Sequence, residues 1–279
     1  MGGRVAGHGS MQLMSKPASN ESDGATPGTV AVQRALMVLK CFQDGEPELR
    51  LSAIARATSL SVSTTHRLLA ALCDEGFLVQ DPDTERYLLG PVLVLLGQRG
   101  ARAGGLDEAH AVLSELTRHT GESTTLAVRS GNDAVVVALS PSPQRLRFDH
   151  GIGSRIALHA SAMGKVLLAC TGADLAAEVR TLGPMERFTR HTITSKTALT
   201  AELRAVRLRG WAHNLEERYD GVVGVAAPVL DDDSNAVAAI GVQGPSARVD
   251  AAESSELVAA VRDAARRLDG CLVPARLRF

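Results

Sequence analysis

The sequence lacks several features that would assign it at once to a familiar class of protein. Its formal net charge is −1, so no overall positive field favours a purely electrostatic binder of DNA or RNA. Its four cysteines, Cys41, Cys73, Cys170 and Cys271, lie far apart and form no CxxC pair or Cys/His cluster. This spacing excludes a zinc finger or zinc ribbon and predicts reduced, mostly buried thiols.

Signals for membranes and export are also missing. No apolar run reaches the roughly 18 residues that a membrane span needs, and the N-terminus lacks the charged-then-apolar pattern of a secretory signal. The sequence therefore predicts a soluble, cytoplasmic protein without a membrane partner.

Motifs for catalysis are absent as well. There is no P-loop, no GxGxxG after a predicted strand and no HExxH. His159 lies near Ser161, but the residues around them form no nucleophile elbow. Adjacent carboxylates rarely face one site, so Glu216 and Glu217 are interpreted as part of a solvated loop. We therefore expect no catalytic residue, no metal site and no cofactor, and a protein that is not an enzyme.

What is present divides into a short helical region and a longer mixed region. The chain has 279 residues, 45% of them apolar, which is enough for two domains. A stretch rich in Gly, Ser, Ala and Pro predicts a disordered N-terminal tail, and Gly104–Gly105 marks an expected hinge. The predicted boundaries are a tail over 1–28, a first domain over 29–90, a linker helix over 91–104, a second domain over 105–273 and a C-terminal tail over 274–279.

Residues 29–90 have the pattern of three helices and a hairpin. Apolar residues from Val32 to Leu39 recur at helical spacing and predict a first amphipathic helix. A second helix is expected in "LSAIARATSL", capped by Ser52, and only a short turn separates it from a third in "VSTTHRLLAALC". The segment "FLVQDPDTERYLL" then predicts a hairpin. This order is typical of a winged helix-turn-helix.

The third helix begins with a surplus of polar side chains. Helical spacing places Val62, Thr65, Leu69 and Leu72 on its buried side. Short hydroxyls on the other side can donate to phosphate oxygens or base edges, and an arginine can bind a phosphate or a guanine. The alternative is an ordinary N-cap followed by a solvated face. The predicted DNA-binding residues are Arg34 in the first helix, Ser61, Ser63, Thr64, His66 and Arg67 in the third, and Thr84 and Arg86 in the wing.

The region after residue 105 alternates between helical and strand-like patterns. Helices are expected over 106–120, 160–170, 199–209 and 251–268, and strands over 123–130, 133–140, 221–230 and 235–244. Helices mixed with antiparallel hairpins predict an α+β domain.

Segments of both regions resemble one family. "VQRALMVLKCF", "LSAIARATSLSVSTTHRLLAALCDEGFLVQDPDTERYLLGP", "LHASAMGKVLLA", "ERYDGVVGVAAPV" and "AAIGVQGP" are similar to the IclR family of bacterial transcription regulators. The resemblance runs from about Val30 to Leu272. It implies a winged helix-turn-helix joined by a linker helix to a GAF- or PAS-like effector-binding domain. It also implies homodimers or dimers of dimers that bind palindromic double-stranded operators under the control of a small organic effector.

The segment from Ser142 to Gly164 has the residues of a small-molecule site. It contains two nearby arginines, Phe148, glycines and a helix start, which suit a carboxylate ligand. The alternative is that the glycines serve turns and Met163 fills the core. By resemblance to the family, together with Phe148, the predicted effector-binding residues are Leu146, Phe148, Ala162, Met163, Asn214, Gly224, Gly241 and Gln243.

Several of these positions depart from the family members that bind small keto acids. Asn214 stands where an acid is frequent, Gly224 replaces a cysteine, and Gly241 and Gln243 replace a pair of serines. The two glycines predict a larger cavity, and we expect an effector bulkier than glyoxylate or pyruvate, such as an aromatic or other hydrophobic acid.

A second class of function stays open at this point. The chain can also be a small-molecule-binding protein or an enzyme whose helical N-terminal module binds another protein. Protection of a palindrome at physiological salt, where nonspecific electrostatic binding weakens, distinguishes the two classes.

Overall fold

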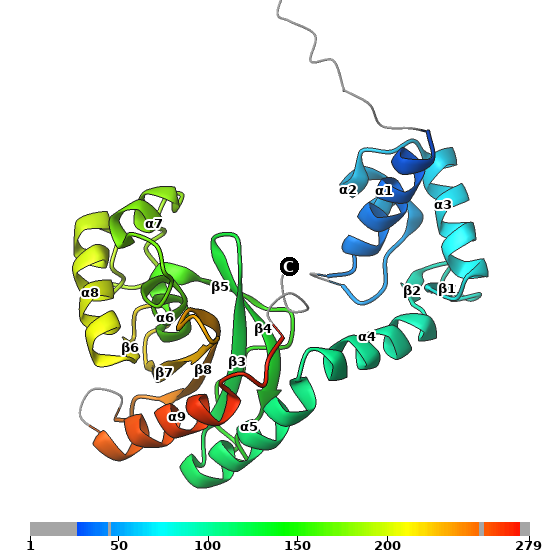
Figure 1. The fold of residues 1–279 in the computed structure, drawn as a ribbon. Coiled ribbons are helices and arrows are strands. Elements are labelled where there is room, and N and C mark those ends of the chain that lie inside the picture. The colour runs from blue at the N-terminus through cyan, green and yellow to red at the C-terminus, as the bar shows by residue number, and fades with distance from the viewer. Residues whose placement is uncertain (1–26, 44–45, 251–253, 274–279) are drawn as a thin grey trace, which may run out of the picture. The chain divides into compact units, whose positions relative to one another are not determined.

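A computed structural model describes residues 27–43, 46–250 and 254–273 (Figure 1). The predicted tails over 1–28 and 274–279 lie outside the described residues, except that the first helix already begins at Pro27. The chain divides into two compact units, with the boundary in the sequence between Leu89 and Gly90.

The first unit consists of three helices and a hairpin. Val38, Ile54, Leu69, Leu78 and Tyr87 form its buried core, and the two hairpin strands pair antiparallel. The predicted winged helix-turn-helix order is confirmed. Its elements are α1 (Pro27–Lys40), α2 (Leu51–Thr58), α3 (Val62–Asp74), β1 (Leu78–Gln80) and β2 (Tyr87–Leu89).

Two local predictions for these helices are wrong. The N-cap of α2 is Arg50, so Ser52 lies inside the first turn and does not cap it. On α3, Thr65 and Leu69 are fully buried, but Val62 is 63% exposed. Side chains on a helix point back toward its N-terminus, so the side chain of the first helical residue extends past the core that the later turns contact.

The apolar side of α1 is also different from the predicted one. Val38 is completely buried, whereas Val32, Leu36 and Met37 are 60%, 52% and 44% exposed. The helix therefore presents an apolar surface to solvent in the single chain, which is unusual unless something covers it.

The second unit is an antiparallel sheet with helices on both faces (Figure 1). The strand order is β5-β4-β3-β8-β7-β6. Helices α5 and α9 pack on one face, and α6, α7 and α8 pack on the other. The predicted α+β class is confirmed. The elements are α4 (Pro91–Ala103), α5 (Leu106–Thr120), β3 (Ser123–Ser130), β4 (Asp133–Ser140), β5 (Arg155–Ala157), the 3-10 turn Leu158–Ala160, α6 (Ala162–Ala169), α7 (Leu175–Thr181), α8 (Lys196–Arg209), β6 (Ala212–Leu215), β7 (Val222–Leu230), β8 (Ala236–Pro245) and α9 (Ser255–Leu268).

The glycine pair between α4 and α5 is packed, so the expected hinge is not where the units divide. Gly105 has a φ of +84°, and a Cβ there would lie 2.3 Å from the carbonyl oxygen of Cys271. A glycine is needed because the backbone after α9 comes this close. The boundary between the units lies earlier, before α4.

Candidate functional site

The first turn of α3 is organised by Ser61. Its side chain accepts a hydrogen bond from the Thr64 amide at 3.2 Å and lies 2.9 Å from the Thr64 hydroxyl. The Thr65 hydroxyl donates to the Ser61 carbonyl at 3.0 Å. Ser61 is therefore the helix cap, and Thr65 belongs to the buried side of α3.

The remaining side chains of this turn face solvent. Ser63, His66 and Arg67 are exposed, and Thr64 is half-buried. The first turn of α3 carries no acidic residue. It thus presents hydroxyl and cationic donors, the groups that bind phosphates and base edges.

An open groove of about 410 Å³ lies between the start of α2, the exposed side of α3 and the wing. It brings together His66 and Thr84, two of the residues predicted from sequence. The wing turn is fixed because the Asp81 carboxylate accepts from the Asp83 and Thr84 amides, which also lowers the pKa of Asp81. The groove is lined by Arg50, Leu51, Ser52, His66, Gln80, Thr84, Glu85 and Tyr87.

Six of the eight lining residues were not predicted as DNA contacts, among them the polar Arg50, Ser52 and Gln80. The prediction had placed such contacts only on α1, on α3 and at the tip and outgoing side of the wing. The start of α2 was interpreted as a cap alone. Arg34 is exposed on α1 and Arg86 is half-buried just before β2, the outgoing strand of the wing, and neither lines the groove.

In the second unit, six of the eight predicted effector residues surround one cavity beside α6. They come from four elements, which the sheet and α6 bring to one place. The six are Ala162, Met163, Asn214, Gly224, Gly241 and Gln243, and the other lining residues are His150, Ser161, Arg218, Tyr219, Val222, Val225 and Val242.

The cavity is small, which corrects the expectation drawn from its glycines. A Cβ on Gly224 would lie 2.7 Å from the Val242 carbonyl oxygen, and one on Gly241 would lie 3.2 Å from Met163 Cγ. The neighbouring side chains already occupy the space that the glycines leave. The free volume is about 20 Å³, room for about one water molecule.

Leu146 and Phe148 do not line this cavity. Leu146 is 70% exposed, because the segment that carries it runs over the surface and is held there through its carbonyl, which accepts from Arg248. The Phe148 ring centroid lies 4.9 Å from that of Tyr219 and 5.0 Å from that of His150. Phe148 thus packs on two lining residues from outside.

The charge at the cavity comes from Arg218, a residue that the sequence reasoning missed. The guanidinium carbon of Arg218 lies 4.7 Å from the Phe188 ring centroid and 5.4 Å from that of Tyr219. Burial, together with the positive charge of Arg218, lowers the pKa of His150 from 6.5 to about 4. His150 is therefore neutral near pH 7, and Arg218 is charged.

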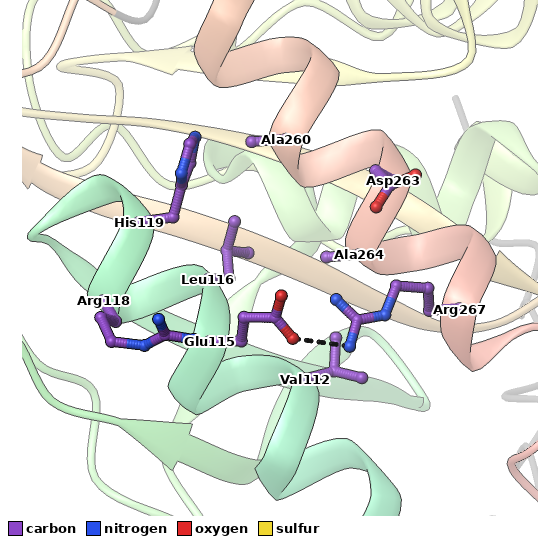
Figure 2. Close-up of a pocket in the computed structure, with 9 residues that line it drawn as sticks. All are labelled: Val112, Glu115, Leu116, Arg118, His119, Ala260, Asp263, Ala264 and Arg267. Carbon is purple, nitrogen blue, oxygen red and sulfur yellow. Dashed lines mark hydrogen bonds and ion pairs between the residues drawn. The ribbon is translucent and has the colours of Figure 1, made fainter.

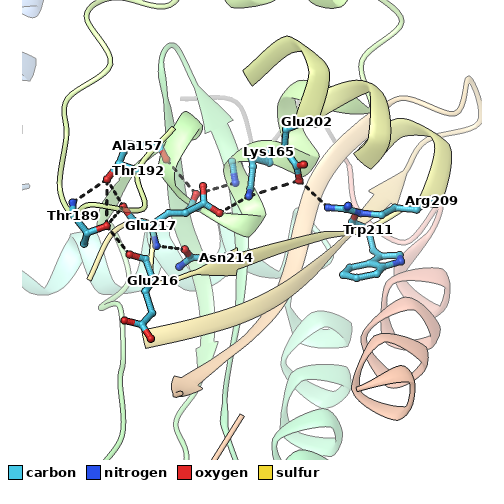
Figure 3. Close-up of polar contacts among 12 residues, drawn as sticks. Ala157, Lys165, Thr189, Thr192, Glu202, Arg209, Trp211, Asn214, Glu216 and Glu217 are labelled. Carbon is cyan, nitrogen blue, oxygen red and sulfur yellow. Dashed lines mark hydrogen bonds and ion pairs between the residues drawn. The ribbon is translucent and has the colours of Figure 1, made fainter. Parts of the chain in front are cut away.

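A buried ion pair supports the loop that follows β6, in which Glu217 lies (Figure 3). Lys165 Nζ lies 2.6 Å from Glu217 Oε1. The Glu217 amide donates to Asn214 Oδ1, and its carbonyl accepts from the Thr192 hydroxyl. The interpretation of Glu217 as part of a solvated loop is wrong, because its side chain is buried and forms an ion pair with Lys165 on α6.

A second groove lies on the other side of the sheet, between α5 and α9 (Figure 2). Its volume is about 470 Å³, and Arg267 on α9 pairs with Glu115 on α5 at 2.7 Å. Both side chains are about half exposed. None of the predicted site residues lines this groove.

No described helix is both long enough and apolar enough to cross a membrane. In the same part of the chain, no three His, Cys, Asp or Glu side chains gather as a metal ion would require.

Comparison with known proteins decides the family. Residues 104–270 match the model of the bacterial transcriptional regulator IclR C-terminal domain, and residues 31–82 match that of the IclR helix-turn-helix domain. The chain belongs to the IclR family. It is thus a helix-turn-helix transcriptional regulator, and the resemblance found in its sequence is confirmed.

Relatives of this IclR-family chain extend over most of its length. The HTH-type transcriptional regulator BhcR of Paracoccus denitrificans is 35% identical over 249 residues, 88% of each chain. A solved structure from Rhodococcus sp. RHA1 is 30% identical, with a TM-score of 0.76 over 87% of this chain and 98% of that one. An IclR homologue from Microbacterium hydrocarbonoxydans, solved with 4-hydroxybenzoate, shares the fold at 22% identity, with a TM-score of 0.74 over 87% of this chain and 98% of that one.

Proposed function

We propose that this regulator binds a palindromic operator through the exposed first turn of α3, and that a small organic effector in the cavity beside α6 modulates this binding. The observation that carries the proposal is the division of α3 into two sides. Thr65 and Leu69 are buried, whereas Ser63, His66 and Arg67 face solvent. Such a protein works on DNA in the cytoplasm and is not an enzyme.

The contacts with DNA follow from the chemistry of the exposed side chains. Arg67 suits a guanine edge or a phosphate, and Ser63 suits either kind of acceptor. Val62, exposed at the start of α3, suits the methyl group of a thymine. His66, Thr84 and the groove beside them lie where one DNA backbone would pass, with Arg34 and Arg86 as further phosphate contacts.

The exposed apolar surfaces favour a homo-oligomer. On α4, Val94, Leu95 and Leu96 are each more than half exposed, and this helix contains no buried residue. Together with the apolar side of α1, they are best explained by a second copy of the chain that covers them. A dimer, or a dimer of dimers, also supplies the two recognition helices that a palindrome requires.

The DNA-binding assignment is tested by gel shift at physiological salt with the region upstream of the gene. The double variant Thr64→Ala/Arg67→Ala should bind at least tenfold more weakly, because each good base contact contributes about 1–3 kcal/mol. Arg204→Ala, which removes an exposed charge on α8, is the matched control and should bind like wild type. Circular dichroism checks that both variants are folded.

Unchanged binding by the double variant would show that α3 is not the reading helix. If the wild-type protein protects no palindrome, the chain instead uses its first unit for protein contacts. The effector site is tested separately by thermal shift against a panel of metabolites, since a ligand that binds the native state raises its apparent stability.

A further inference from the structure

The cavity beside α6 contains two nitrogen donors that have no acceptor. Arg218 Nε and Gln243 Nε2 are both buried without a hydrogen-bond partner, and both residues line the cavity. A buried donor left unpaired costs about 1–3 kcal/mol, and more if its group is charged. A ligand oxygen that accepts from both would remove this cost.

The two nearby carboxylates, Glu217 and Asp149, pair with other cations, and neither accepts from Arg218 Nε or Gln243 Nε2. Glu217 lies next to Arg218 in the loop after β6, but its carboxylate pairs with Lys165 at 2.6 Å. Asp149 pairs with Arg147 at 2.6 Å and also accepts from Ser123. Among the described residues that line the cavity, Arg218 alone carries a charge near pH 7.

Flat apolar surfaces adjoin one of the two donors, Arg218. The Arg218 guanidinium lies over the Phe188 and Tyr219 rings, and Phe148 packs on Tyr219 at 4.9 Å between ring centroids. Rings stack favourably with other rings in offset or edge-on arrangements. The surroundings of Arg218 therefore suit a ligand whose body is planar.

We infer that the effector is a ring-bearing monocarboxylate whose carboxylate binds Arg218 and Gln243. The inference rests on the proposed function, in which this cavity is the effector site. A second carboxylate is disfavoured because the cavity offers it no second cation, and an unpaired buried charge is costly. Arg218 is thus the residue that selects an acid over its neutral analogue.

A ring-bearing ligand is larger than the free cavity, so it has to displace side chains when it enters. The free volume is about 20 Å³, whereas ligand sites usually measure about 300–1,000 Å³. Tyr219 is 41% exposed and Phe148 packs on it from outside, so these two rings are the ones that can move outward. Met163, an adaptable side chain, can make room inside.

Calorimetry with benzoate and 4-hydroxybenzoate as probes, and benzamide as the neutral analogue of benzoate, tests the inference. We expect wild type to bind at least one of the acids, and benzoate at least tenfold more tightly than benzamide. Arg218→Met should remove this preference, and Arg218→Lys should restore part of it, since lysine keeps the charge but not the planar fork. Arg204→Met is the matched control on α8 and should bind like wild type.

Equal binding of benzoate and benzamide by wild type, or an unchanged preference in Arg218→Met, would overturn the inference. A second variant separates this failure from failure of the proposed function. Met163→Phe narrows the cavity without changing Arg218. If a ligand from the metabolite panel is not a ring-bearing acid and its binding is lost in Met163→Phe, the cavity is the effector site and only the ligand class is wrong. If no metabolite stabilises wild type or changes its DNA binding, the effector part of the proposed function fails.

Discussion

Lys165 Nζ on α6 lies 2.6 Å from Glu217 Oε1, and the two side chains are only 1% and 6% exposed. The pair connects α6, which begins at the cavity, to the loop after β6 that carries Arg218. The other carboxylate oxygen of Glu217 is buried without a hydrogen-bond partner. The carboxylate therefore depends on Lys165 for compensation of its charge.

Loss of Lys165 should strongly destabilise the second unit. Lys165→Met leaves the Glu217 carboxylate buried without its cation, and such changes cost about 3–5 kcal/mol. Urea unfolding followed by the fluorescence of Trp211, the one tryptophan of the chain, measures this cost. The control is Arg267→Met, which breaks an exposed pair with Glu115 and should cost less than about 1 kcal/mol. Equal costs for the two variants would contradict the assignment of a buried pair.

Alanine substitutions at Ser61 and Ser63 should have different effects, the first on stability and the second on DNA binding. Ser61→Ala removes the cap of α3 and should lower stability by about 1 kcal/mol. Ser63→Ala removes an exposed hydroxyl and should change stability by less than about 0.5 kcal/mol, while it weakens binding to the operator. Thermal unfolding followed by circular dichroism, together with gel shifts, measures both effects. A larger stability loss in Ser63→Ala than in Ser61→Ala would reverse the roles given to these serines.

Substitution by alanine at two helical glycines should change the free energy of unfolding in opposite directions. A Cβ on Gly164 would lie 2.3 Å from the carbonyl oxygen of Leu158, whereas one on Gly100 would meet nothing within 4 Å. Gly164→Ala should cost at least about 1–3 kcal/mol, since the contact is with backbone. Gly100→Ala should raise the free energy of unfolding by about 0.5–1 kcal/mol, because alanine has a higher helix propensity than glycine. Urea unfolding of both variants checks the two signs, and a stable Gly164→Ala protein would contradict the close packing of α6.

Stability should fall as the pH falls from about 6.5 toward 4, with His150 as one cause. Its pKa in the folded protein is about 4, first because it is buried and then because Arg218 lies near. Between this value and the ordinary 6.5, the unfolded chain binds the proton and the folded chain does not, so acid favours unfolding. The contribution is on the order of 3 kcal/mol. Unfolding free energies at pH 7 and pH 5 should differ less in His150→Gln than in wild type, and equal differences would refute the role of His150.

Sequence signals that act locally were sufficient to predict most helices and the hairpin. Gly121 and Gly210 end α5 and α8 in the left-handed conformation, and Pro91 starts α4, as the patterns indicate. The pairing of β8 with β3 joins segments more than a hundred residues apart in the sequence. No local pattern encodes that pairing, so the strand order could not be predicted.

Burial was harder to predict than secondary structure. Helical spacing predicted that Val62 lies in the core, and the adjacent carboxylates predicted that Glu217 lies in a solvated loop. Both predictions failed because the neighbouring elements decide which side chains are covered. The family resemblance supplied six residues of the cavity, but it could not supply Arg218. That arginine lies in a loop of polar residues, where sequence alone gives no sign that the chain folds back over the cavity.

The central strand β8 is the single layer of backbone that separates the cavity from the core under α5 and α9. Gly241, Val242 and Gln243 line the cavity, while Ile240 and Val242 also belong to the core under α5 and α9. A ligand that moves the backbone of Gln243 also moves the peptide that this residue shares with Val242, whose side chain packs under the helices on the far face. Helix α5 follows directly after α4 in the chain. A displacement that starts at the cavity face of the sheet can therefore pass through α5 to α4, the helix that leads to the DNA-binding unit.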